Sequence, residues 1–219
     1  MELSFLTILG AGFILGIKHA IEPDHVIAVS TIASQSKNLW RSSLAGVYWG
    51  IGHTATLFVV GMFLLLMKGQ MPTKVTLTLE LFVGLMLLYL GISTLISLAN
   101  RRTHRHQHQN HHNNVSYIKS LIIGFIHGLA GSAAIVLLTI STVNTVLEGG
   151  LYILVFGTGT IGGMLMFTTF IGIPYVLSEK KLSAHAALIG LTGMISTIFG
   201  VYYMYNLLVN ESLFRMWIE

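Results

Sequence analysis

The sequence contains no cysteine, which excludes disulfide bonds and metal sites built on thiolates. Charge is scarce as well, because Asp, Glu, Lys and Arg together make up 9% of the 219 residues, whereas soluble domains carry about 25%. Hydrophobic residues account for 53% of the chain, and its mean hydropathy is +0.75. This composition indicates a membrane protein. Any metal ion that it binds has only His, carboxylate, Met, backbone and water as ligands.

Long apolar segments fill most of the chain and leave almost no room for a soluble domain. They cover approximately residues 4–35, 42–67, 75–99, 117–147, 150–177 and 185–208. A membrane-spanning helix needs about 20 apolar residues, so we predict an all-α polytopic membrane protein with about six transmembrane helices. The first segment starts with Glu2 and shows no clear cleavage signal, so we expect a span there and not a signal peptide.

The positive charges predict an orientation. The loops after the first, third and fifth segments carry Lys37, Arg41, Arg101, Arg102, Arg105, Lys119, Lys180 and Lys181, whereas the opposite side has only Lys68, Lys74 and Arg215. Because cytoplasmic loops are enriched in Lys and Arg, we expect both termini outside the cell. These loops also explain the net charge of +4, which does not suggest a nucleic-acid partner.

Two parts of the chain resemble each other. GIKHAIEPDHVIAVSTI (16–32) aligns with GFIHGLAGSAAIVLLTI (124–140), which pairs His19 with His127 at an offset of 108 residues. VGLMLLYLGI (83–92) aligns with TGMISTIFGV (192–201) at an offset of 109. A unit of three spans is an odd number, so its second copy enters the membrane from the other side. We therefore predict inverted three-helix repeats at 1–99 and 117–219, as in many transporters. Ordinary packing of glycine-rich membrane helices is the alternative explanation.

The first and fourth segments are too long for one straight span. Each contains a helix-breaking feature at a matching place, Pro23 in the first and GLAG (128–131) in the fourth. We therefore expect both helices to be broken near the middle of the membrane, as discontinuous helices are in transporters.

A group of ionisable residues interrupts the first apolar segment. It comprises Lys18, His19, Glu22, Asp24 and His25. One charge at the bilayer centre costs about 2.5–3.5 kcal/mol on insertion scales, and a bound divalent cation would offset that cost. On an unbroken helix, His19 and the Asp24–His25 pair would point about 120–140° apart, and a break at Pro23 lets them converge. Since His and carboxylate bind Ni²⁺, Co²⁺ and Zn²⁺, we predict an intramembrane metal site. The alternative places the group in interfacial water at the end of a short span.

The spacing His19-x4-Asp24-His25 resembles the HX4DH signature of the nickel/cobalt transporter superfamily, which includes the NiCoT and NicO families. HAIEPDHVIAVST (19–31), GHT (52–54) and HGLAGSAA (127–134) resemble most closely its short UreH-type members, urease accessory membrane proteins. The resemblance extends over nearly the whole chain. It departs from the larger members, which have eight spans, an acidic motif in the later half and commonly Asp where Glu22 stands.

This resemblance implies a transporter of Ni²⁺ or Co²⁺ in the inner or plasma membrane of a prokaryotic cell. It makes His19, Asp24 and His25 essential residues, with His53 matching the histidine of the second family motif. It also implies nickel supply to urease or another nickel enzyme, with cytoplasmic metallochaperones as candidate partners. The metal ion is then the substrate, and no cofactor is expected. Neither the preferred metal nor the direction of transport follows from the resemblance.

Further polar residues lie inside the later apolar segments. We predict His53 and His127 as additional metal ligands, because each is a histidine within a span. Thr54 and Thr56 either line the same cavity or bond to backbone carbonyls. Ser132 takes the place of Asp24 in the second copy, and we expect it to serve packing or gating.

RRTHRHQHQNHHNN (101–114) contains five histidines and separates the halves, so we predict a flexible cytoplasmic loop at 100–116. Short His-rich tracts bind metal weakly, and a solvated linker is the alternative. HQNHH (108–112) also matches a His box of membrane di-iron oxidoreductases, but no partner box lies beside it. We therefore expect a transporter and not an enzyme. A carrier of anions would need Arg or Lys at the site, whereas His, Asp and Glu suit a cation.

Overall fold

The computed structural model describes residues 2–36, 38–67, 71–103, 116–143 and 145–218, with the backbone alone at 2–4, 101–103, 132–138 and 140–142. Over these ranges the chain is helical and has no strand, which confirms the all-α prediction. The helices are α1 (Glu2–His19), α2 (Pro23–Ala33), α3 (Leu39–Met67), α4 (Thr73–Thr103), α5 (Tyr117–Thr142), α6 (Val146–Ser178), α7 (Leu182–Tyr205), the π-helical turn η1 (Asn206–Asn210) and α8 (Leu213–Ile218).

Several helices have the length and apolarity that a membrane requires. Helices α3, α4, α6 and α7 qualify alone, and the bent pair α1–α2 makes a fifth candidate span. Helix α5 is 26 residues long, and its part up to Gly131 is apolar. Large apolar side chains also face outward, such as Phe170 (73% exposed) and Leu177 (74%). Apolar surface on that scale fits contact with lipid and supports a multi-pass membrane protein.

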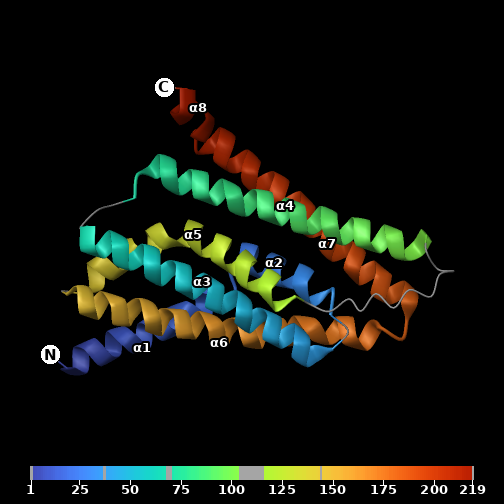
Figure 1. Cartoon of the computed structure of the whole chain (residues 1–219), viewed down its shortest axis with the longest axis horizontal. Helices are drawn as coiled ribbons and strands as arrows, with labels where there is room; N and C mark the ends of the chain where they lie inside the picture. Colours follow the sequence, from blue (N-terminus) through green and yellow to red (C-terminus); the bar gives the residue numbers. More distant parts are fainter. Residues whose placement is uncertain (1, 37, 68–70, 104–115, 144, 219) are drawn as a thin grey trace.

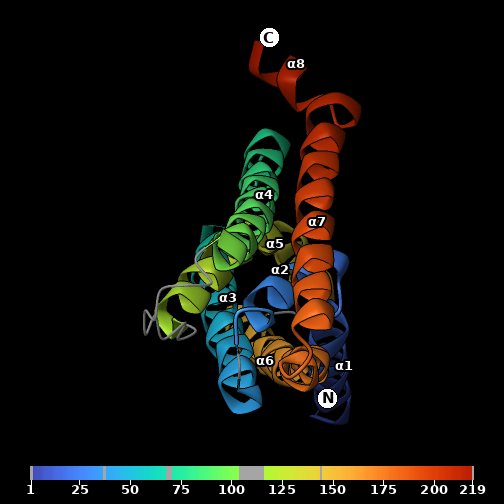
Figure 2. The same ribbon diagram turned by 90° about the vertical axis from the view of Figure 1, so that its right-hand side faces the viewer.

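The helices form two groups with α2 between them (Figures 1 and 2). In the first group, α3 packs against both α5 and α6, and α1 packs against α6. The second group is the pair α4–α7. Helix α2 contacts α3 and α6 on one side and α4 and α7 on the other. The short helix α2 therefore lies at the centre of the bundle, where its side chains can meet residues from both groups.

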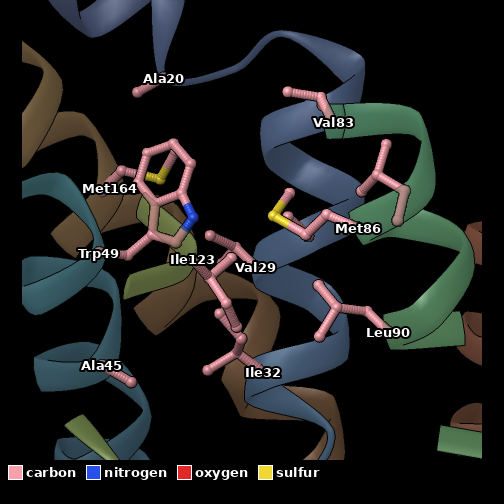
Figure 3. Packing of buried hydrophobic residues seen from close by; sticks show 12 residues of the cluster. Ala20, Val29, Ile32, Ala45, Trp49, Val83, Met86, Leu90, Ile123 and Met164 are labelled. Carbon is pink, nitrogen blue, oxygen red and sulfur yellow. The ribbon is translucent and has the colours of Figure 1, made fainter. Parts of the chain in front are cut away.

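The apolar core surrounds α2 (Figure 3). Trp49 of α3 is fully buried, and Val29 of α2 and Ile123 of α5 belong to the same buried cluster. On the other side of α2, the cluster continues through Met86 and Leu90 of α4. This packing fixes the position of α2 relative to the neighbouring helices and so positions the residues at its N-terminus.

The break between α1 and α2 falls at Pro23, as the sequence predicts. The chain bends by 58° between the axis of α1 and the axis of α2. At the end of α1 the backbone tightens into three-residue turns, with the Glu22 amide donating to the His19 carbonyl (3.1 Å). Glu22 is extended, with φ −62° and ψ 146°, which is the conformation that a following proline favours. Pro23 then begins α2, where its missing N–H costs no helical hydrogen bond.

The predicted break in the fourth span is wrong, because α5 is one continuous helix from Tyr117 to Thr142. The glycines at 124 and 128 serve close packing instead. A Cβ at Gly124 would lie 2.0 Å from the Trp49 carbonyl oxygen, and one at Gly128 would lie 2.6 Å from that of His53. Small residues let membrane helices approach each other in this way without a break.

Candidate metal centre

Six residues predicted from the sequence lie together at the break. His19 comes from the end of α1, Glu22, Asp24 and His25 from the α1–α2 junction, and the remaining two, His53 and His127, from α3 and α5. His25, His53 and His127 are between 0% and 2% exposed. The three histidines are therefore enclosed by protein, whereas Glu22 of the same group is 52% exposed. The folding of α2 between the two helix groups brings these distant residues to one place.

Asp24 connects two of the histidines. Nδ1 of His25 donates to Oδ1 of Asp24 (2.9 Å), and Nε2 of His127 donates to Oδ2 (2.8 Å). The backbone N–H of His25 also donates to Oδ1 (2.9 Å). With Nδ1 engaged, the Nε2 atom of His25 is left without a hydrogen-bond partner among the described residues. A carboxylate that orients a histidine and leaves its other nitrogen free is typical of metal sites.

Glu22 holds His19 in the same manner. Nδ1 of His19 lies 3.0 Å from Oε1 of Glu22, and Nε2 of His19 lies 3.1 Å from Nε2 of His53. Because the first contact engages the Nδ1 proton, the Nε2 lone pair of His19 faces His53. The Glu22 side chain is 52% exposed. Glu22 is thus placed to orient His19 from the solvent side.

The nitrogen spacing suits one ion. Nitrogens about 2.0–2.1 Å from a shared metal lie about 2.8–3.4 Å apart at ordinary coordination angles, and the His19–His53 pair is 3.1 Å apart. Two groups have one ligand atom per residue within 4.8 Å of the others: His19 with His25 and His53, and Asp24 with His25 and His127. His25 belongs to both groups. The site can therefore hold one ion on three nitrogens, with a carboxylate close by.

An aromatic wall closes the site on the side of α3. The Trp49 ring stacks on His53 (centroids 5.0 Å apart) and meets His25 edge-on (5.0 Å). Nδ1 of His53 is buried and has no partner among the described residues. The rings of His25 and His127 lie 4.2 Å apart. This packing restricts the rotation of the imidazoles and pre-organises their nitrogens for a ligand.

A cavity of about 380 Å³ gives access to the cluster. His19, Asp24, His25 and His127 line this cavity, and Thr76, Glu80 and Tyr203 line it from α4 and α7. Lys18 and Glu22 also face this cavity. Burial of the histidines is therefore compatible with entry of a small hydrated ion.

Three neighbouring residues do not emerge from the sequence reasoning: Trp49, Glu80 and Tyr203. Glu80 could have been predicted from the sequence, because a carboxylate inside an apolar segment is costly and commonly marks a functional site. Trp49 could have been found by its spacing, because it lies four residues before His53 on the same helix. Tyr203 could not, because its contact with the site depends on the packing of α7.

The two threonines bond to backbone carbonyls, Thr54 to that of Gly157 (3.2 Å) and Thr56 to those of Gly52 and Phe125 (both 3.0 Å). They therefore serve helix packing and do not line the cavity. The Ser132 side chain and the His-rich residues 104–115 lie outside the described part of the chain.

The fold and this site define a class: multi-pass membrane proteins with histidines and carboxylates gathered at a broken helix inside the bundle. Residues 5–128 match the NicO family, described as high-affinity nickel-transport protein. The chain belongs to this family, which confirms the resemblance found in the sequence and agrees with the expectation that it is a transporter.

Several named proteins are similar to this chain. It is 57% identical to the urease accessory protein UreH of Bacillus sp. (strain TB-90), over 100% of this chain and 99% of that protein. It is 27% identical to a putative nickel/cobalt efflux system of Methanocaldococcus jannaschii, over 87% of this chain and 88% of the relative. A chloroplast protein of Arabidopsis thaliana, FOR GROWTH AND FERTILITY 2, is 27% identical over 89% of this chain and 58% of its own length. No solved structure matches the chain.

Proposed function

We propose that this protein carries Ni²⁺, or Co²⁺, across a prokaryotic inner or plasma membrane through the buried His and carboxylate site. The observation that carries the proposal is the group of three imidazole nitrogens from His19, His25 and His53 beside the Pro23 break. Imidazole suits nickel and related divalent metals. Membership in a nickel-transport family supports the same substrate.

Within this site, we assign the nitrogens of His19, His25 and His53 to the ion. Asp24 and Glu22 orient His25 and His19, and their negative charge offsets that of the cation. His127 donates to Asp24 and completes the carboxylate's hydrogen bonding from α5. A metal bound between His19 and His53 replaces their hydrogen bond, so the Nε2 proton of His53 must leave that nitrogen, either for the unpartnered Nδ1 of the same ring or for water.

The proposed architecture is six spans in two inverted repeats, 1–99 and 117–219, joined by the cytoplasmic segment 100–116. Helix contacts support it, because exchanging α1 with α5 and α3 with α6 turns the α1–α6 contact into the α5–α3 contact. Close approaches repeat as well. A Cβ at Gly16 would lie 2.0 Å from the Phe156 carbonyl oxygen, and one at Gly124 would lie 2.0 Å from that of Trp49. The sequence offsets between these partners are 108 and 107 residues, close to those of the sequence repeat.

The physiological role proposed is nickel supply to urease or another nickel enzyme, with cytoplasmic metallochaperones receiving the ion and both chain termini outside the cell. The support is the similarity to a urease accessory protein over the full chain. Export is the second candidate, because one relative is named a putative efflux system. The same ligands serve either direction.

Transport by purified protein tests the function. We expect proteoliposomes containing the protein to accumulate or release radioactive Ni²⁺ with saturation at low concentration, whereas empty liposomes do neither. Competition by Co²⁺, Zn²⁺ and Mg²⁺ then ranks the metals, and Mg²⁺ should compete poorly because it prefers oxygen ligands. Nickel flux indistinguishable from that of empty liposomes would contradict the proposal.

The His-rich segment should tune transport without being needed for it. The proposed site uses none of its histidines, so deletion of residues 104–112 should change the apparent affinity and leave the maximal rate largely intact. Replacement of the same residues by a Gly/Ser segment of equal length is the matched control for loop length. Complete loss of transport in a correctly inserted deletion would place the segment on the transport path.

A further inference from the structure

Glu80 is an ionisable residue inside a candidate membrane span, about two turns from the start of α4. It is the only acidic residue in the sequence of that helix, TKVTLTLELFVGLMLLYLGISTLISLANRRT. Charged side chains at membrane depth are expensive and commonly mark the path of an ion. The cost of placing Glu80 at this position therefore indicates that the residue has a function beyond packing.

The contacts of Glu80 distinguish it from the other carboxylates of the cavity. Asp24 accepts from His25 and His127, and Glu22 pairs with His19. Glu80 accepts only one long hydrogen bond, from the Tyr203 hydroxyl to Oε2 (3.4 Å), and forms no ion pair with any side chain that the structure describes. Its charge is thus the one least compensated along the cavity wall.

The location of Glu80 relates it to the His cluster. Glu80 and Tyr203 line the same cavity of about 380 Å³ as His19 and Asp24. Thr76 lies one turn before Glu80 on α4 and lines it too. These residues come from the α4–α7 pair, whereas the histidines of the site come from α1, α2, α3 and α5. An ion that enters between the two helix groups therefore faces Glu80 on one wall and the histidines on the other.

We propose that Glu80, held by Tyr203, is a transient binding site on the entry path, which receives the hydrated divalent cation before it reaches the histidine site. This inference rests on the proposed function and adds a residue to the path. A carboxylate attracts the cation and accepts hydrogen bonds from the water molecules bound to it. The imidazoles then replace that water. Glu80 thus governs the rate at which the ion reaches and leaves the site, while the histidines determine the affinity.

The test compares Glu80→Gln with the wild type in two measurements. The glutamine keeps the size and the hydrogen-bond acceptor for Tyr203, and it removes only the charge. We expect uptake at low nickel to fall by about tenfold or more, in the range that charged clefts contribute to association rates. Equilibrium Ni²⁺ binding in detergent, measured by calorimetry, should change far less. Glu179→Gln, at the C-terminal end of α6 and outside the cavity lining, is the matched control and should behave as the wild type.

Each outcome decides the proposal. Uptake by Glu80→Gln equal to the wild type overturns it. Loss of equilibrium binding also overturns it, since Glu80 would then be a ligand of the central site. A defect in Tyr203→Phe with none in Glu80→Gln would show a purely structural hydrogen bond and overturn it as well. If the wild type itself neither binds nor moves nickel, the proposed function fails, and that result is separate from any difference between the variants.

Discussion

His25→Ala is expected to abolish nickel binding and transport. His25 is the residue shared by both groups of potential ligands, so its loss leaves His19 with His53 on one side and Asp24 with His127 on the other. Neither remaining pair offers three donors to one ion. We expect the affinity for Ni²⁺ to fall by more than about 100-fold, beyond the 10–100-fold that loss of an outer-shell partner typically costs. Calorimetry in detergent and uptake into proteoliposomes measure the two effects.

The controls separate loss of a ligand from loss of the fold. His185 lies near the start of α7, far along the chain from the site, and contacts Ser178 at the end of α6. The variant His185→Ala should therefore bind nickel normally. The nickel affinity of Glu22→Gln should lie between those of His185→Ala and His25→Ala. This substitution loosens the orientation of His19 but leaves the ligand nitrogen of His19 in place. Normal helix content and a monodisperse size-exclusion profile for His25→Ala complete the comparison. Wild-type affinity in that variant would rule out the histidine site.

Much of the fold follows from the sequence because membrane helices obey simple constraints. A run of about 20 apolar residues must be helical in lipid, since its backbone has no other hydrogen-bond partners. Pro23 predicts the break after α1 correctly, because its ring removes an amide proton and extends the preceding residue. The GLAG sequence at 128–131 does not predict a helix break as clearly as a proline does. Glycine permits a break and equally permits close packing, and the approach of α3 decides for packing.

The candidate site was accessible from the sequence to the extent that its chemistry is local. His19, Asp24 and His25 lie within seven residues of one another, and the cost of burying such groups identifies them. Their partners His53 and His127 could be proposed because histidines are rare within spans. The division of labour could not be predicted, because only the folded chain shows that Asp24 joins His25 to His127 and that Glu22 faces His19. The edge-on contact of Trp49 with His25 likewise exists only after α3 and α2 pack.

Gly124→Ala is expected to destabilise the protein and disrupt the site together. The new Cβ would lie 2.0 Å from the Trp49 carbonyl oxygen, whereas carbon and oxygen atoms in the closest favourable contacts are about 3.3–3.6 Å apart. Helix α5 must therefore move away from α3. Overpacking of this kind costs about 1–3 kcal/mol, and occasionally more. Because His127 follows Gly124 by one turn and His53 follows Trp49 by one turn, the same movement separates the two histidines.

The measurements are thermal unfolding in detergent and Ni²⁺ affinity, and Gly162→Ala is the matched control. Gly162 also lies in a long helix, but a Cβ there meets nothing within 4 Å, so its stability and affinity should equal or exceed those of the wild type. The proposed repeat adds a second expectation. Gly16→Ala should reproduce the effect of Gly124→Ala, because its Cβ would lie 2.0 Å from the Phe156 carbonyl oxygen and would force α1, which carries His19, away from α6. Equal losses in both variants would show that the two copies hold the histidines by the same contact. Tolerance of alanine at either glycine would mean that the helices can separate without harm, and that the close packing does not position the site.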